Sequence, residues 1–173
     1  FPRESITHAI ATHAEGVGMW AWRTDDGAWV PFFPNAEILV DQRELDAIDD
    51  GSHPSAGDPR FAQLREQGAA QAITADVTDE VTVEVVGAHS PGHLLVWINS
   101  EGQTAVMVGH LALSPLHFAT GECPQQHPDP PAAEAVLERL RSSDALLIGP
   151  LWPTPGAGYW VGAGFTPATP AAV

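Results

Sequence analysis

The sequence contains little cysteine and little positive charge. Cys123 is the single cysteine among 173 residues, so the chain cannot form an internal disulfide, and a reducing cytoplasm is the simplest compartment to expect. The 7 basic side chains stand against 22 acidic ones, which gives a formal net charge of -15. This charge repels phosphate backbones and anionic lipids, so we expect neither nucleic acid nor a membrane surface as a partner.

Long apolar runs are missing as well. No stretch approaches the roughly 18 apolar residues of a membrane span, and residues 1–5 have neither the basic region nor the apolar run of a signal peptide. A hydrophobic content of 44%, together with 16 Gly and 16 Pro, predicts a globular chain with many turns and short elements. The length is sufficient for one domain with a buried core.

Short strands and helices alternate along the predicted chain. Strands are expected over residues 6–12, 37–40, 77–86 and 145–149, and in two runs that meet at the Glu101-Gly102 turn. Helices are expected over 42–49, 59–73 and 132–140, the last one preceded by the start signal Asp129-Pro130-Pro131. We expect one domain over residues 1–160 and a Gly-, Pro- and Ala-rich tail over 161–173.

One segment carries most of the functional information. His89-Ser90-Pro91-Gly92-His93 precedes a β-rich run, and the next apolar run ends at Gly109-His110. This order resembles the second half of a metallo-β-lactamase-superfamily hydrolase. In that family the last His of an H-x-P-G-H motif binds metal, and the next strand ends in a Gly-Asp whose carboxylate bridges two metals. His110 stands where that Asp is expected.

The resemblance extends from Glu4 to about Trp160. Residues 4–13 are similar to the acidic lead-in, buried strand and Thr-His that open the family's H-x-H-x-D-H loop. Beyond them Glu15 replaces the second His, Val17-Gly18 replaces the Asp-His pair, and Leu151 stands where a final His is expected. Residues 17–20 and 31–36 resemble the lactonase, arylsulfatase and organophosphate-hydrolase branch.

A second register of the N-terminal motif is open. If the motif begins at Thr7-His8, the chain keeps His8 and His13 and loses the ligands at Ile10 and Thr12. We rank this register second because it leaves no apolar strand before the ligands.

The resemblance implies an α/β fold, the four-layered αββα sandwich, of which this chain would cover the C-terminal two-thirds. The strands that precede the first metal-binding loop in the family are not in the sequence. An isolated remainder would expose a sheet edge and one face of its core. We therefore expect another chain or a cleaved N-terminal segment to complete the sandwich, and an oligomer is a further option.

The same resemblance implies changed metal chemistry. The family's first site becomes His13, Glu15 and His93, with His110 as a fourth ligand or as a partner of a bound water. The second site is lost, because its positions lack side-chain donors. We therefore expect at most one ion, Zn or Fe, and leave open that none binds. One ion that lowers the pKa of its water would suffice for hydrolysis of a small apolar ester or lactone.

Two other functions stay open. His93 and His110 could act as catalytic acid or base in an enzyme that needs no metal, or the domain could bind a ligand or partner without catalysis. A pocket for the small-molecule substrate is predicted from apolar residues, which could equally cover core edges or face a partner. These residues are Trp20, Trp22, Phe32, Phe33, Leu151 and Trp152. The remaining histidines, His8, His53, His117 and His127, are expected to be solvated or capping residues.

Overall fold

The computed structural model describes residues 1–16, 20–74 and 76–169. The chain forms two compact units, Phe1–Thr74 and Ala75–Val173. None of the helices formed by the described residues has the length and apolar character that a bilayer span requires.

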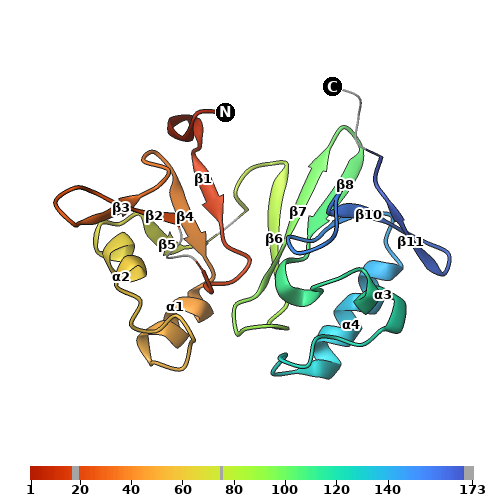
Figure 1. The fold of residues 1–173 in the computed structure, drawn as a ribbon. Helices are drawn as coiled ribbons and strands as arrows, with labels where there is room; N and C mark the ends of the chain where they lie inside the picture. The colour runs from red at the N-terminus through yellow and green to blue at the C-terminus, as the bar shows by residue number, and fades with distance from the viewer. Residues whose placement is uncertain (17–19, 75, 170–173) are drawn as a thin grey trace. The chain divides into compact units, whose positions relative to one another are not determined.

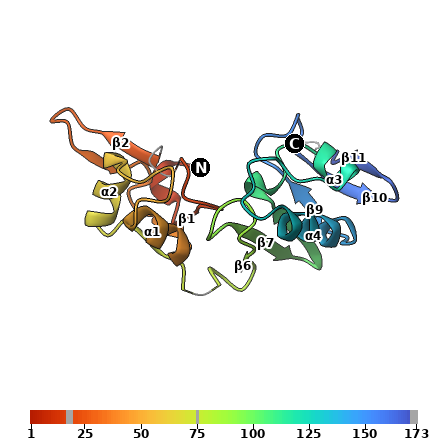
Figure 2. The same ribbon diagram turned by 90° about the horizontal axis from the view of Figure 1, so that it is seen from below.

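The first unit is built on a parallel sheet in the order β1-β4-β5. Its elements are the short helix η1 (Arg3–Ser5), the strands β1 (His8–Ile10), β4 (Glu37–Val40) and β5 (Ala70–Ala72), and the helices α1 (Gln42–Asp49) and α2 (Pro59–Glu66). Figures 1 and 2 show both long helices beside the sheet. Leu45 of α1 and Leu64 of α2 join Ile38 of β4 in the buried core of this unit. Parallel strands connected through helices give this unit its α/β character.

Helix α2 is shorter than its sequence suggested. The predicted helix over 59–73 ends at Glu66, and β5 follows almost at once. The cause is Gly68, whose φ of 72° lies in the left-handed region that ends a helix. The prediction is therefore wrong beyond Glu66, whereas the strand over 37–40 and the helix over 42–49 are confirmed.

A small antiparallel hairpin completes the first unit. It consists of β2 (Ala21–Arg23) and β3 (Trp29–Pro31), which flank the turn at Asp25-Asp26-Gly27. The backbone N–H of Trp29 donates to the side chain of Gln63 at 2.8 Å, and the side chain of Gln67 donates to the Trp29 carbonyl at 2.7 Å. Gln63 of α2 and Gln67 at its C-cap therefore fix the hairpin to the helix.

The second unit contains a six-stranded sheet in the order β11-β10-β9-β8-β7-β6, in which β8 and β9 are parallel and the other neighbours antiparallel. Its strands are β6 (Val81–Val85), β7 (Leu94–Ser100), β8 (Gln103–Met107), β9 (Leu146–Ile148), β10 (Ala157–Val161) and β11 (Gly164–Pro167). The tail predicted from residue 161 is thus part of the sheet as far as Pro167. Phe165 of β11 explains the difference, because its ring packs edge-on against Trp152 with 5.4 Å between centroids.

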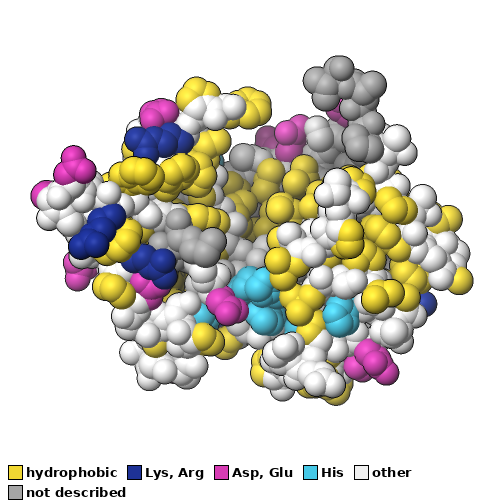
Figure 3. All heavy atoms as spheres, viewed as in Figure 1, with side chains coloured by type: hydrophobic (Ala, Val, Ile, Leu, Met, Phe, Trp, Pro, Cys, Tyr) yellow, Lys and Arg dark blue, Asp and Glu magenta, His cyan; other side chains and the backbone are white. Residues whose placement is uncertain are grey.

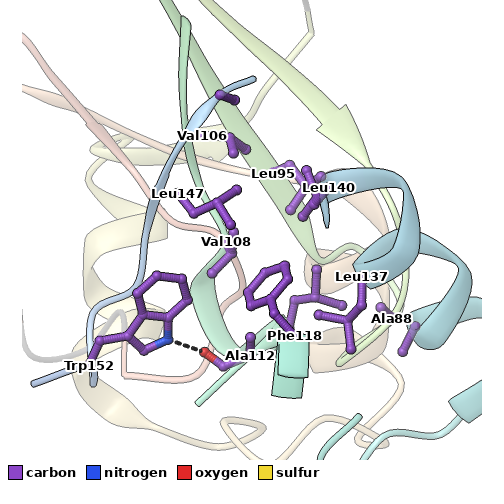
Figure 4. Close-up of a cluster of buried hydrophobic side chains, with 13 residues drawn as sticks. Ala88, Leu95, Val106, Val108, Ala112, Phe118, Leu137, Leu140, Leu147 and Trp152 are labelled. Carbon is purple, nitrogen blue, oxygen red and sulfur yellow. Dashed lines mark hydrogen bonds between the residues drawn. The ribbon is translucent and has the colours of Figure 1, made fainter. Parts of the chain in front are cut away.

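One face of this sheet is covered by helices. They are the short η3 (Gly109–Leu111), α3 (Leu116–Thr120) and α4 (Pro130–Arg141). Figure 4 shows Leu137 and Leu140 of α4 and Phe118 of α3 packed among apolar side chains of the strands. Asp129 caps α4 by accepting a hydrogen bond from the Ala132 amide at 3.1 Å, as its sequence predicted.

The opposite face of the sheet is apolar as well. The valines of β6 at 81, 83 and 85 pair in register with Ile98, Val96 and Leu94 of β7. Leu94 and its neighbour Leu95 point to opposite faces, yet both are fully buried. Strands that bury both faces are typical of an inner layer in a layered α/β fold.

Candidate metal centre

The first pair of candidate ligands lies in the loop that follows β1. His13 is buried, and its Nε2 lies 3.8 Å from Oε2 of Glu15, whose side chain is 51% exposed. The other ring nitrogen of His13 is 3.0 Å from Oγ1 of Thr12. Loops after the carboxyl ends of parallel strands are common positions for functional sites. His8, which the second register would use, is exposed on β1 itself.

A buried histidine–carboxylate contact lies beside this loop. His53 was expected to be solvated or capping, but it is buried, and its Nε2 is 3.1 Å from Oε2 of the fully buried Glu44. The amide of Ser55 donates to the other ring nitrogen of His53 at 3.0 Å. His53 is buried because the buried carboxylate of Glu44 needs hydrogen-bond donors around it, and His53 is one of them.

The motif at residues 89–93 forms the turn between β6 and β7. The His93 amide donates to the Ser90 carbonyl at 3.1 Å, and the Val86 amide donates to the His93 carbonyl at 2.8 Å. η3, which carries His110, follows β8 directly. Since β6, β7 and β8 are antiparallel neighbours, the end of β6, the start of β7 and the end of β8 lie at one edge of the sheet.

Four histidines gather at this edge. The His89 ring lies between the others, with centroid distances of 5.8 Å to His93, 5.0 Å to His110 and 5.3 Å to His127. His93 is fully buried, while His89 and His110 are partly exposed. Figure 3 shows that several histidine side chains of the protein reach the surface.

His127 differs from what its sequence suggested. It was expected to be solvated or capping, yet it is 5% exposed. Its burial, and next the neighbouring His89, lower its pKa to about 4. The imidazole of His127 is therefore neutral at neutral pH. His127 lies 17 positions after His110 along the chain, in a loop without a recognisable motif, so no sequence signal marks it.

Each unit contains a pair of ligand-type side chains. The ligand atoms of His13 and Glu15 lie within 4.8 Å of each other, and so do those of His89 and His110. Imidazole nitrogen and carboxylate oxygen are ordinary ligands of Zn and Fe. His89 was missed as a candidate because the first His of the H-x-P-G-H motif is not a ligand in the family it resembles.

The positions predicted as a substrate pocket fall into different environments. Trp22 is 54% exposed and lies 6.2 Å from Phe32, which meets Phe33 edge-on at 5.1 Å. Trp20 and Phe33 pack partly against the core of the first unit. The Arg3 guanidinium lies 5.6 Å from the Phe32 ring centroid, and Figure 3 shows arginines next to hydrophobic side chains on this unit.

The last two of these positions lie in the second unit. Leu151 is 59% exposed, whereas Trp152 is 7% exposed and packs within the apolar core. Figure 4 shows the indole N–H of Trp152 donating to the Ala112 carbonyl, at 2.8 Å. Val17 and Gly18, the predicted losses of the second metal site, lie outside the described residues.

A groove adjoins the first ligand pair. It has a volume of about 500 Å³ and is lined by Glu15, Gly16 and residues 54–60. Arg60 at its wall forms a two-pronged contact with Asp58, with distances of 3.0 and 2.6 Å. The half-exposed carboxylate of Glu15 thus belongs both to a ligand pair and to an open groove.

Comparison with known proteins identifies the fold. No family model matches the chain, and no curated protein matches it. The solved hydrolase AbOPH of the beta-lactamase superfamily matches with a TM-score of 0.71 at 18% identity. AidC, a dizinc quorum-quenching lactonase solved with a homoserine-type product, matches with a TM-score of 0.74 at 20% identity. Each match covers 99% of this chain and 67% of the matched chain.

A probable metal-dependent hydrolase from Staphylococcus aureus has a TM-score of 0.67 at 17% identity, over 86% of this chain and 56% of its own. The chain therefore spans between about half and two thirds of the length of these structures. At such identities the likeness establishes the fold and leaves the activity to the residues of the site.

Proposed function

The chain has the αββα metallo-β-lactamase fold, spanning part of it, and from this premise we propose that it is a hydrolase of small apolar esters or lactones that uses a single metal ion. The ligands in this proposal come from His13, Glu15, His93 and His110. The observation that carries it is the imidazole–carboxylate pair after β1, in which Nε2 of His13 lies 3.8 Å from Oε2 of Glu15.

The donor set fits one ion of the Zn or Fe type. Two imidazoles and one carboxylate make three protein ligands and leave a coordination position open, as in catalytic rather than structural sites. When bound, such an ion lowers the pKa of a water molecule toward neutrality and so supplies a nucleophile. Leu151, at the expected position of the family's final His, offers no ligand atom, which supports one ion rather than two.

His89 joins the candidates for the imidazole ligands. Its ring nitrogen lies within 4.8 Å of that of His110, and both rings are partly exposed, whereas His93 is fully buried. In the proposal, His110 and either His89 or His93 bind the ion. The other histidine of this motif packs against the metal-binding rings and helps to orient them.

The groove beside Glu15 supports a small-molecule substrate. Its volume of about 500 Å³ lies in the range of small-molecule sites. Since Arg60 is already paired with Asp58, its charge is largely satisfied, which favours a neutral ester or lactone over an anionic substrate. The net charge of -15 favours the same choice.

Acid–base catalysis without a metal is the second candidate. It is favoured by the four-histidine cluster, in which the low pKa of His127 keeps a neutral imidazole beside His89. Imidazoles at this distance could pass a proton to or from a substrate.

Hydrolysis assays distinguish the two candidates. The protein is treated with a chelator, dialysed and reloaded with Zn or Fe, and tested on a panel of neutral esters and lactones. We expect activity that disappears with the metal, returns on reloading and falls at least about 100-fold in His110→Ala and Glu15→Ala. His8→Ala is the control, because His8 is exposed on β1. Activity that persists without metal and depends on His93 or His110 would favour the acid–base candidate.

A further inference from the structure

A fully buried carboxylate holds the middle of the loop that carries His13 and Glu15. We infer that Glu44 is a positioning residue, which fixes this loop through the Ala14 amide so that the two candidate ligands face each other. The inference rests on the proposed function as far as metal binding is concerned. The contact itself is a property of the first unit alone.

The position of Glu44 makes this contact unexpected. Glu44 is the third residue of α1, whose N-cap is Asp41, and at that spacing a Glu usually bonds back to the N-cap amide as a capping box. Here its Oε2 accepts a hydrogen bond from the Ala14 amide at 2.7 Å, across 30 positions of sequence. Asp41 caps α1 by accepting a hydrogen bond from the Arg43 amide at 2.9 Å.

His53 is the second donor to the same oxygen. Because the Ser55 amide donates to Nδ1 of His53, that nitrogen carries a lone pair and Nε2 carries the hydrogen. Nε2 lies 3.1 Å from Oε2 of Glu44 and donates to it. A buried carboxylate is tolerated only with such donors, so its interactions with Ala14 and His53 depend on each other.

Ala14 is held from both sides. While its N–H bonds to Glu44, its carbonyl accepts a hydrogen bond from Oγ of Ser55 at 3.3 Å. Both polar groups of this buried backbone unit are therefore bound by side chains from the segment that follows β4. A loop of three residues whose central peptide groups are fixed has little freedom to turn its two outer side chains apart.

This arrangement gives Glu44 a role at a distance from the metal. His13 and Glu15 flank Ala14, so a rotation of either peptide group of Ala14 would change the direction of a ligand. Residues that orient ligands commonly alter metal affinity by about 10- to 100-fold when they are changed. Glu44 would touch neither the ion nor the substrate.

Hydrogen exchange in the metal-free protein tests the contact. In Glu44→Gln we expect the Ala14 amide to exchange roughly tenfold faster or more, because a charge-assisted hydrogen bond becomes a neutral one. Glu66→Gln, the same change on the exposed end of α2, is the control and leaves Ala14 unchanged. An unchanged Ala14 exchange rate in folded Glu44→Gln overturns the inference.

Binding of Co²⁺ tests the positioning role. At a temperature at which all variants are folded, we expect Glu44→Gln to bind Co²⁺ about 10- to 100-fold more weakly and with a changed visible spectrum. Glu66→Gln keeps both the affinity and the spectrum of the wild type. Equal affinity and an equal spectrum in Glu44→Gln contradict a positioning role, even if stability falls.

Two results keep this inference separate from the proposed function. If the wild type binds no Co²⁺, Zn or Fe, the proposed function fails, and the exchange rate of Ala14 still decides whether Glu44 holds the loop. If Glu44→Gln does not fold, Glu44→Asp replaces it, because the shorter side chain keeps the buried carboxylate and withdraws it from the Ala14 amide. Glu44→Asp should then accelerate Ala14 exchange and weaken Co²⁺ binding, and no change in either would overturn the inference.

Discussion

Trp152 contacts several parts of the core of the second unit. Its ring meets Phe118 at 5.8 Å and Phe165 at 5.4 Å, both edge-on, and its indole N–H donates to the buried Ala112 carbonyl. Aromatic pairs in this geometry contribute beyond their buried area. Trp152 therefore anchors Phe165 of β11 to the core of the second unit.

Replacing this indole should destabilise the fold. Trp152→Phe leaves the Ala112 carbonyl without its donor and opens a small cavity, and we expect the free energy of unfolding to fall by about 2 kcal/mol. Urea denaturation measures the loss. Trp22→Phe is the control, since Trp22 is 54% exposed, and it should change stability by less than about 0.5 kcal/mol. Equal effects of the two substitutions would argue against the core role.

The close approach of Gly149 to the same indole gives a second test. A Cβ at Gly149 would overlap the ring atoms of Trp152, whereas a Cβ at Gly164 in β11 would meet nothing within 4 Å. We expect Gly149→Ala to lower the melting temperature by about 4 °C or more, from an overpacking cost of about 1–3 kcal/mol. Gly164→Ala should lie close to wild type. A Gly149→Ala protein that melts with the wild type would contradict this packing.

Among the elements, α2 depends on its N-terminal cap. Asp58 accepts from the Arg60 amide at 2.9 Å, and the Arg60 guanidinium lies 2.6 Å from its other oxygen. The hydrogen bond from Arg60 is the main reason that the pKa of the Asp58 carboxyl lies below its ordinary value of 3.8. The charged form therefore stabilises the folded state at pH values above 3.8, and this contribution is lost as the pH falls through the lowered pKa.

The pH dependence of a cap variant follows from this. At pH 7 we expect Asp58→Ala to be less stable than the wild type by about 1 kcal/mol. The gap should narrow as the pH falls below 3.8, because the wild-type carboxyl becomes protonated. Urea denaturation of both proteins over a pH series measures the gap. A stability difference that stays constant over the pH series would show that the charge of Asp58 does not contribute to the stability of the folded state.

Elements with local signals were predictable from the sequence. The strand over 37–40, the helix over 42–49 and the turn at Glu101-Gly102 depend on neighbouring residues, and the structure confirms them. β11 depends on its pairing with β10 and on the burial of Phe165, which a Gly- and Pro-rich sequence does not reveal. The end of α2 depended on the backbone conformation of Gly68 rather than on apolar spacing.

In the candidate site, too, the residues that a local sequence motif marks were predicted, and those that depend on contacts distant in sequence were not. The H-x-P-G-H motif singled out His93, and its spacing to the next apolar run singled out His110. Glu44, His53 and His127 owe their roles to burial among residues distant in sequence, so no local pattern marked them. Whether the predicted ligands bind an ion stays a prediction.

At the scale of the whole molecule, the chain shares its fold with the solved dizinc lactonase AidC, and our proposal gives it a donor set reduced to one metal ion. Each unit contributes candidate ligands at the ends of its strands. The reduced donor set is the reason to expect one ion, and the buried contacts of Glu44 are the reason to expect a defined geometry for it.

The metal content of the purified protein tests this account most directly. Elemental analysis, with intact mass to establish which chains are present, should give close to one Zn or Fe per chain, lost after dialysis against a chelator and strongly reduced in His13→Ala and His110→Ala. His8→Ala should retain the ion. Two ions per chain, or no ion even after loading with Zn or Fe, would contradict the account.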